Sequence, residues 1–240
     1  MKSKIRRGFM LITNIYMQKK IFTTEFGGKT LTAEFNDLTT HANGSVMLSY
    51  GETVILVTAV MGKSDAGLSY FPLSVEFEEK FYAAGEILGS RFVRREGRPS
   101  DEAVLSARIV DRTIRPLFPS HIKINVQVVV TVLAIGEDDP DVLGVIGASL
   151  ALSTSDIPWS GPVGAVRVAR RKADNKIILN PTYKDREENE LDFEILSCGK
   201  DQKINMIETA ACEMQEEDII KVLETPLSKH KVNWLSFKIK

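Results

Sequence analysis

The 240-residue chain is poor in residues that build covalent or metal cross-links, with two cysteines and three histidines. Cys198 and Cys212 form neither a disulfide framework nor a metal-ligand spacing. We expect both to be small core residues of a protein in the reducing cytoplasm. The histidines occur singly along the chain, so we expect no zinc site.

The chain also lacks long apolar runs and a strong net charge. No apolar run approaches the ~20 residues needed to cross a bilayer, so no membrane association is expected. The net charge is -1, so any nucleic-acid binding must come from a local basic patch. At the start, a short apolar stretch follows four cations but has no signal-peptide cleavage site. We interpret residues 1–17 as a leader or extension, with Met17 the favoured start.

Hydrophobic periodicity predicts a mixture of strands and helices. Two hairpins are expected around the glycine turns at 27–29 and 51–52, and the β-branched run at 53–61 predicts a central strand. The predicted strands cover 21–26, 30–35, 45–50, 53–61, 71–79, 124–135, 165–170, 176–180, 191–197 and 203–208. Helices are expected over 100–117, 138–153 and 216–224. The irregular alternation favours an α+β fold in which mixed β-sheets pack with helices.

The helix predicted after Ser100 shows both a cap and a candidate core face. Ser100 can cap it, and the acids Asp101 and Glu102 suit the first turn. An apolar stripe on this helix should be buried. That stripe comprises Val104, Leu105, Ile109, Ile114, Leu117 and Phe118.

The densest basic feature lies in residues 81–99, which lack periodicity and predict a long loop. Arg91, Arg94, Arg95 and Arg98 stand within eight residues, and Phe92 lies beside them. Guanidinium groups fork onto phosphates, and an aromatic ring stacks on bases, so this run suits single-stranded nucleic acid. The equally weighted alternative is a solvated loop whose arginines pair with nearby acids.

A second basic set lies on the helix that follows the loop. It comprises Arg108, Arg112 and Arg115. Asp111 can pair with Arg115 at the i,i+4 spacing. For the whole set, helix-surface placement and structural pairing are favoured over ligand binding.

Several blocks, in order over about residues 18–224, resemble the first ribonuclease PH-like core domain of the polynucleotide phosphorylase (polyribonucleotide nucleotidyltransferase) family. They are 82–85 (YAAG), 92–100 (FVRREGRPS), 111–119 (DRTIRPLFP), 146–152 (IGASLAL) and 161–167 (GPVGAVR). Several such blocks in register are far more specific than one short motif. We therefore expect a first ribonuclease PH-like domain at 18–225. Residues 226–240 no longer resemble the family and are interpreted as a truncated or frameshifted tail.

The resemblance implies phosphorolytic degradation of RNA from the 3′ end, with inorganic phosphate as co-substrate and nucleoside diphosphates as products. It also implies Mg²⁺, a role in mRNA turnover, and a homotrimeric ring whose channel takes single-stranded RNA. In that family, the loop that corresponds to residues 81–99, called the arginine loop below, binds RNA. This role carries over to Phe92, Arg94, Arg95 and Arg98.

The resemblance places the catalytic centre mainly in a second core domain, which this chain lacks. There, serines at a helix start cradle phosphate, and two aspartates and a lysine serve the chemistry. The corresponding residues here are Asp139, Pro140 and Asp141, then Arg186, Asp192 and Glu194. Carboxylates at a helix start repel phosphate, and proline lacks the N–H donor. We therefore predict no catalytic and no metal-binding residue, with Mg²⁺ bound outside this chain.

Three interpretations follow. The chain is the first core domain of a phosphorolytic nucleotidyltransferase, or it is a non-catalytic module for RNA binding and ring assembly when on its own. The third, a free-standing ribonuclease PH-like enzyme, is disfavoured by the acids that replace the phosphate-binding serines.

Overall fold

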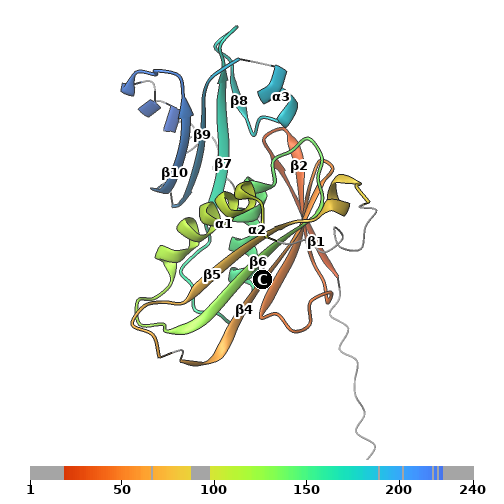
Figure 1. The fold of residues 1–240 in the computed structure, drawn as a ribbon, viewed down its shortest axis with the longest axis vertical. Helices are drawn as coiled ribbons and strands as arrows, with labels where there is room; N and C mark the ends of the chain where they lie inside the picture. Colours follow the sequence, from red (N-terminus) through yellow and green to blue (C-terminus); the bar gives the residue numbers. More distant parts are fainter. Residues whose placement is uncertain are drawn as a thin grey trace, which may run out of the picture.

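The structure is a computed structural model and describes residues 19–65, 67–87, 98–188, 190–201, 203–217, 219–220 and 222–223. It contains two β-sheets with helices α1 and α2 packed beside them (Figure 1). The predicted leader at 1–17 and tail at 226–240 lie outside these ranges. This architecture is α+β, as predicted.

The larger sheet has six strands in the order β1-β2-β3-β4-β6-β5. Only the β5–β6 pair among them is parallel. The strands are β1 (Lys20–Phe26), β2 (Lys29–Phe35), β3 (Gly44–Tyr50), β4 (Thr53–Asp65), β5 (Leu73–Glu79) and β6 (Ile124–Ala134). Both predicted hairpins are confirmed, and Gly27 and Gly51 supply the positive φ angles of their turns.

The smaller sheet has four antiparallel strands in the order β10-β9-β7-β8. They are β7 (Gly164–Arg171), β8 (Ile177–Leu179), β9 (Leu191–Lys200) and β10 (Lys203–Ala211). On one side, Leu196 and Cys198 of β9 join the core that α2 forms with the larger sheet. On the other side, Phe193 and Ile195 pack with Val222.

Helix α2 (Pro140–Ser153) lies at the centre of the core, as its uniformly apolar sequence predicts. Asp139 caps it by accepting a hydrogen bond from the Asp141 backbone N–H. Gly147 allows close contact with the sheet, because a Cβ there would stand 2.5 Å from Val57 Cγ2. The close packing of α2 against β3 and β4 therefore depends on a glycine at position 147, which has no side chain.

Helix α1 (Asp101–Ile114) begins at the predicted Ser100 cap, but its predicted buried stripe is partly wrong. Ile109 and Ile114 are buried, whereas Val104 and Leu105 are 45% and 53% exposed. The helix turns a different face toward its neighbours. That buried face comprises Ala103, Ser106, Ile109, Val110, Thr113 and Ile114.

Three features differ from the sequence-based expectations. A 3-10 turn, η1 (Phe81–Ala84), interrupts the predicted loop, and α3 (Tyr183–Glu188) was not expected. Cys198 is buried as predicted, but Cys212 is exposed because it lies just past the exposed end of strand β10. Over the described ranges, no helix is long and apolar enough to cross a membrane.

Gly147→Ala tests the close approach of α2 to β4. We expect the unfolding free energy to fall by about 1–3 kcal/mol through overpacking against Val57, only partly offset by better helix propensity. Urea denaturation measures it. Ser153→Ala, at the exposed end of the same helix, is the control and should change stability little. Equal stability of the two variants would contradict the close packing.

Candidate functional site

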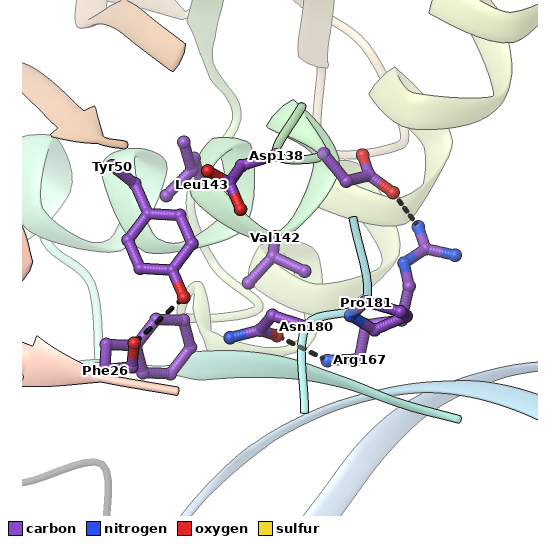
Figure 2. A pocket seen from close by; sticks show the side chains of 9 residues that line it. Phe26, Tyr50, Asp138, Val142, Leu143, Arg167, Asn180 and Pro181 are labelled. Carbon is purple, nitrogen blue, oxygen red and sulfur yellow. Dashed lines mark hydrogen bonds and ion pairs between the residues drawn. The ribbon is translucent and has the colours of Figure 1, made fainter. Parts of the chain in front are cut away.

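Charged residues from four elements converge at the start of helix α2. Asp139 and Asp141 come from the helix start, Arg167 from β7, Arg186 from α3 and Glu194 from β9. Figure 2 shows part of this region, with Arg167 beside Asn180 and Pro181 beneath the helix start. Residues spread over 55 positions of the chain, from Asp139 to Glu194, thus form one site.

Arg167 is the centre of this ion network. Its Nη2 lies 2.9 Å from Asp139 Oδ2 and 3.0 Å from Asp141 Oδ2, and its Nη1 lies 2.5 Å from Glu194 Oε1. Its side chain is only 11% exposed. One buried guanidinium therefore pairs with three carboxylates, and two of these pairs are charge-assisted hydrogen bonds.

Arg186 supplies the second positive charge. It pairs with Asp139, approaches Glu194 with its Nε at 3.5 Å, and lies over the Tyr183 ring at 5.3 Å. Three carboxylates against two guanidinium groups leave one excess negative charge. Burial, and then the neighbouring Asp139 carboxylate, raise the pKa of Asp141 to about 6.

A second ion pair fastens the larger sheet to the same helix start. Lys29, beside the β1–β2 turn, places its Nζ 2.5 Å from Asp138 Oδ1. The Thr53 hydroxyl donates to the Asp138 carbonyl at 2.8 Å. Nearby, the Tyr50 hydroxyl donates to the Phe26 carbonyl (Figure 2). The turns of two hairpins are thus tied to the segment that leads into α2.

The network fills the place where a helix start would attract an anion. The free N–H of Asp141 is taken by the Asp139 carboxylate at 2.9 Å, and Pro140 has no N–H to offer. Two carboxylates already lie in the positive field of the helix dipole at this end, and they repel a phosphate. The site is therefore occupied by the chain's own charged side chains, with one negative charge in excess, and is unsuited to inorganic phosphate.

Most positions that the family resemblance matched to catalytic residues do converge here. Asp139, Asp141, Arg186 and Glu194 share the network, but Asp192 pairs separately with Arg170 at 2.9 Å. This pairing agrees with the structural role expected for Asp192. Arg167 was not predicted as a site residue, although an arginine between the apolar pairs 165–166 and 168–169 is a usable signal.

The network does not fit a resident magnesium ion. Mg²⁺ prefers carboxylate and water oxygens. Here the carboxylates are engaged by Arg167 and Arg186. Within the part of the chain that the structure covers, no group of three or more His, Cys, Asp or Glu side chains could hold a metal.

Of the predicted RNA-binding residues, Arg98 is exposed, while Phe92, Arg94 and Arg95 lie outside the described residues. The two ends of this segment are linked, since the Ser100 hydroxyl donates to Glu79 Oε2 at 2.9 Å. This hydrogen bond therefore joins the end of strand β5 to the N-cap of helix α1.

The second basic set divides into paired and unpaired members. Arg115 pairs with Asp111 at 2.6 Å, as predicted, and also donates to the carbonyls of Phe71 and Leu73. Arg108 and Arg112 are exposed and have no hydrogen-bond or ion-pair partner among the described residues. These two therefore occupy the helix-surface position that was expected beside structural pairing.

Comparisons with known proteins agree with this architecture. The family model "3′ exoribonuclease family, domain 1" matches residues 27–158, and "3′ exoribonuclease family, domain 2" matches 161–228. The chain is 46% identical over 206 residues to a polyribonucleotide nucleotidyltransferase of Heliobacterium modesticaldum, covering 85% of this chain and 28% of that protein. It is 45% identical over 207 residues to that of Staphylococcus saprophyticus, covering 86% and 29%.

The chain thus spans less than a third of the length of these relatives. Among solved structures, it is similar to rice (Oryza sativa) Rrp46, with a TM-score of 0.67 and 15% identity. That alignment covers 88% of this chain and 94% of the rice protein. At this identity the likeness concerns the fold alone.

Arg167→Met tests the centre of the network. Removing the guanidinium leaves three carboxylates without their shared partner, so we expect a loss of about 3–5 kcal/mol in unfolding free energy. Chemical denaturation measures this loss. Arg170→Met, which breaks one ion pair with Asp192 and the contact with the Phe193 ring, is the control and should cost less. Equal losses would show that Arg167 is not the centre.

Asp141 should make stability depend on pH. Its pKa in the folded chain, about 6, lies above the ordinary value of 3.8. Its stabilising contribution is therefore complete below pH 3.8 and is lost as pH rises through 6. The contribution should fall by about 2–3 kcal/mol between roughly pH 4 and 7.

The measurement is the difference in unfolding free energy between the wild-type chain and Asp141→Asn across this pH range. The difference isolates Asp141 from other acids that titrate in the same window. A difference that stays constant with pH would contradict the raised pKa.

Proposed function

Because this chain belongs to the 3′ exoribonuclease (ribonuclease PH-like) family, we propose that it is the first core domain of a polyribonucleotide nucleotidyltransferase and that its own role is to hold single-stranded RNA. The observation that carries this proposal is the internally paired, net negative start of helix α2. Asp139 and Glu194 both pair with Arg167 there. The phosphorolytic chemistry then belongs to a second core domain outside this chain.

The arginine loop supplies the grip on RNA. Arg98 is exposed, and Phe92, Arg94 and Arg95 belong to the same run of the sequence. Guanidinium groups bind phosphodiesters, and the Phe92 ring stacks on a base. The Glu79–Ser100 hydrogen bond supports this role, because it joins the residues that flank this run on either side.

In the complete assembly, the reaction shortens RNA from its 3′ end with inorganic phosphate as co-substrate and releases nucleoside diphosphates. Mg²⁺ acts at the second core domain, and the full-length subunits form a homotrimer around an RNA channel. This activity serves mRNA turnover in the cytoplasm. A chain without its second domain acts as a non-catalytic module for RNA binding and assembly.

The grip is tested by changing Arg94, Arg95 and Arg98 together to alanine. Binding to short poly(A) should weaken, and the slope of log affinity against log salt should fall by about 2, because three phosphate contacts disappear. Fluorescence anisotropy over a salt series measures both.

Alanine at Lys63, Lys123 and Lys172 is the matched control, because these exposed lysines carry the same total charge but lie elsewhere. If both triple variants weaken RNA binding equally, the binding reflects overall charge rather than specific contacts with these arginines. Phosphate-dependent release of ADP from poly(A) by the wild-type chain alone would contradict the proposed division of labour.

A further inference from the structure

The two edges of the larger sheet differ in how they are protected. Strand β5 forms one edge, and the Arg115 guanidinium covers the beginning of this strand by donating to the carbonyls of Phe71 and Leu73. Strand β1 forms the opposite edge. Among the residues that the structure describes, no strand or side chain hydrogen-bonds to the outer side of β1. Such an edge is a template on which another strand can pair.

The geometry of the first hairpin decides which backbone groups of β1 face outward. Its two-residue glycine loop has φ angles of 58° and 87°, as in a type I′ turn. In such a turn the flanking residues, Phe26 and Lys29, form a hydrogen-bonded pair, and the antiparallel ladder alternates from there. The backbone N–H and C=O groups of Ile21, Thr23 and Glu25 therefore point away from β2, toward the open edge.

Strand β1 has few of the features that discourage pairing at an edge. It pairs with β2 from Lys20 to Phe26 without a bulge, and it contains no proline. Ile21 is 54% exposed, and Thr23 is exposed as well. β-Branched residues such as these favour strand pairing. Only the charged side chains of β1 and its flank could oppose a second strand.

We propose that β1 pairs antiparallel with β1 of a second copy of this chain. In the register that places Ile21 opposite Thr23 of the second copy, Lys19 stands opposite Glu25, and Glu25 stands opposite Lys19. Opposite charges and β-branched residues that face each other across strands stabilise a pair. A shift by two residues would place Ile21 opposite Glu25 and lose both charge pairs. The charges of β1 are thus complementary to those of its own copy.

Both charged side chains are available for this contact. Glu25 is exposed and has no ion-pair partner among the described residues. The Lys19 side chain is 55% exposed, and its Nζ lies 2.7 Å from Glu34 Oε2 on the neighbouring strand. Glu34 lies opposite Ile21, on the face that also carries Lys19 and Glu25. Lys19 can therefore bridge Glu34 and Glu25 of the second copy.

The contact has two-fold symmetry, because the same strand is used on both sides. It joins two six-stranded sheets edge to edge into one continuous sheet. A three-fold ring cannot place identical strands antiparallel to each other, so this contact is separate from the ring proposed above. The inference therefore goes beyond the proposed function and does not rest on RNA binding.

The first test is sedimentation velocity of the 240-residue chain, without RNA, over a wide range of concentrations. We expect a weak dimer that forms as the concentration rises, because a single strand pair buries little surface. Lys19→Glu and Glu25→Lys should each weaken the dimer about tenfold, since each places like charges opposite one another twice. Mixing these two variants should restore association, because every facing pair is then of opposite charge.

Lys20→Glu is the matched control. It makes the same change of charge in the same strand, but Lys20 stands opposite the uncharged Thr24 of the second copy and lies on the other face. This variant should dimerise like the wild-type chain. Thermal melts check that all three variants, which are at exposed positions, remain folded.

Amide hydrogen exchange locates the contact. The N–H groups of Ile21, Thr23 and Glu25 should exchange more slowly as the dimer forms, whereas that of Thr24, already bonded to β2, should change little. A chain that stays monomeric at every concentration overturns the proposal. A dimer that resists both single variants, or that leaves these three amides unprotected, overturns it as well. Poly(A) binding enters neither readout, so a failure of the arginine loop to bind RNA would leave this result unchanged.

Discussion

The buried guanidinium of Arg167 is the constraint on which the arrangement of the two sheets depends. It lies on a strand of the smaller sheet and neutralises the start of α2, the helix that packs on the larger sheet. Apolar residues could stabilise such a junction equally well, but removing one partner from a buried ion network is costly. The network therefore fixes how β7, β9 and α3 meet the helix.

This constraint also explains how the domain can keep its fold without a phosphate-binding site at the start of α2. A helix start is a natural anion site, and its use requires free N–H groups and an uncompensated field. Asp139 and Asp141 occupy both, and Arg167 and Arg186 balance them internally. The ribonuclease PH-like architecture is kept while its phosphate-binding potential is used for structure.

Local patterns predicted most of the fold, and long-range contacts account for what they missed. Hairpin turns, β-branched runs and the Ser100 and Asp139 caps are encoded within a few residues. The exposure of Val104 and Leu105 depends on which side of α1 meets its neighbours. Arg167 was not predicted as a site residue for the same reason, because the carboxylates that pair with it lie 26 to 28 positions away in the chain.

The same reasoning applies to charge, for which the net value of -1 is a poor guide. Ion pairs inside the domain join acidic and basic side chains in nearly equal numbers. The net charge therefore says little about where unpaired charged side chains remain on the surface. Arg98, Arg108 and Arg112 all belong to α1 or the segment just before it, and all are exposed. An almost neutral chain can therefore present a local positive surface, and the fold sets its position on helix α1.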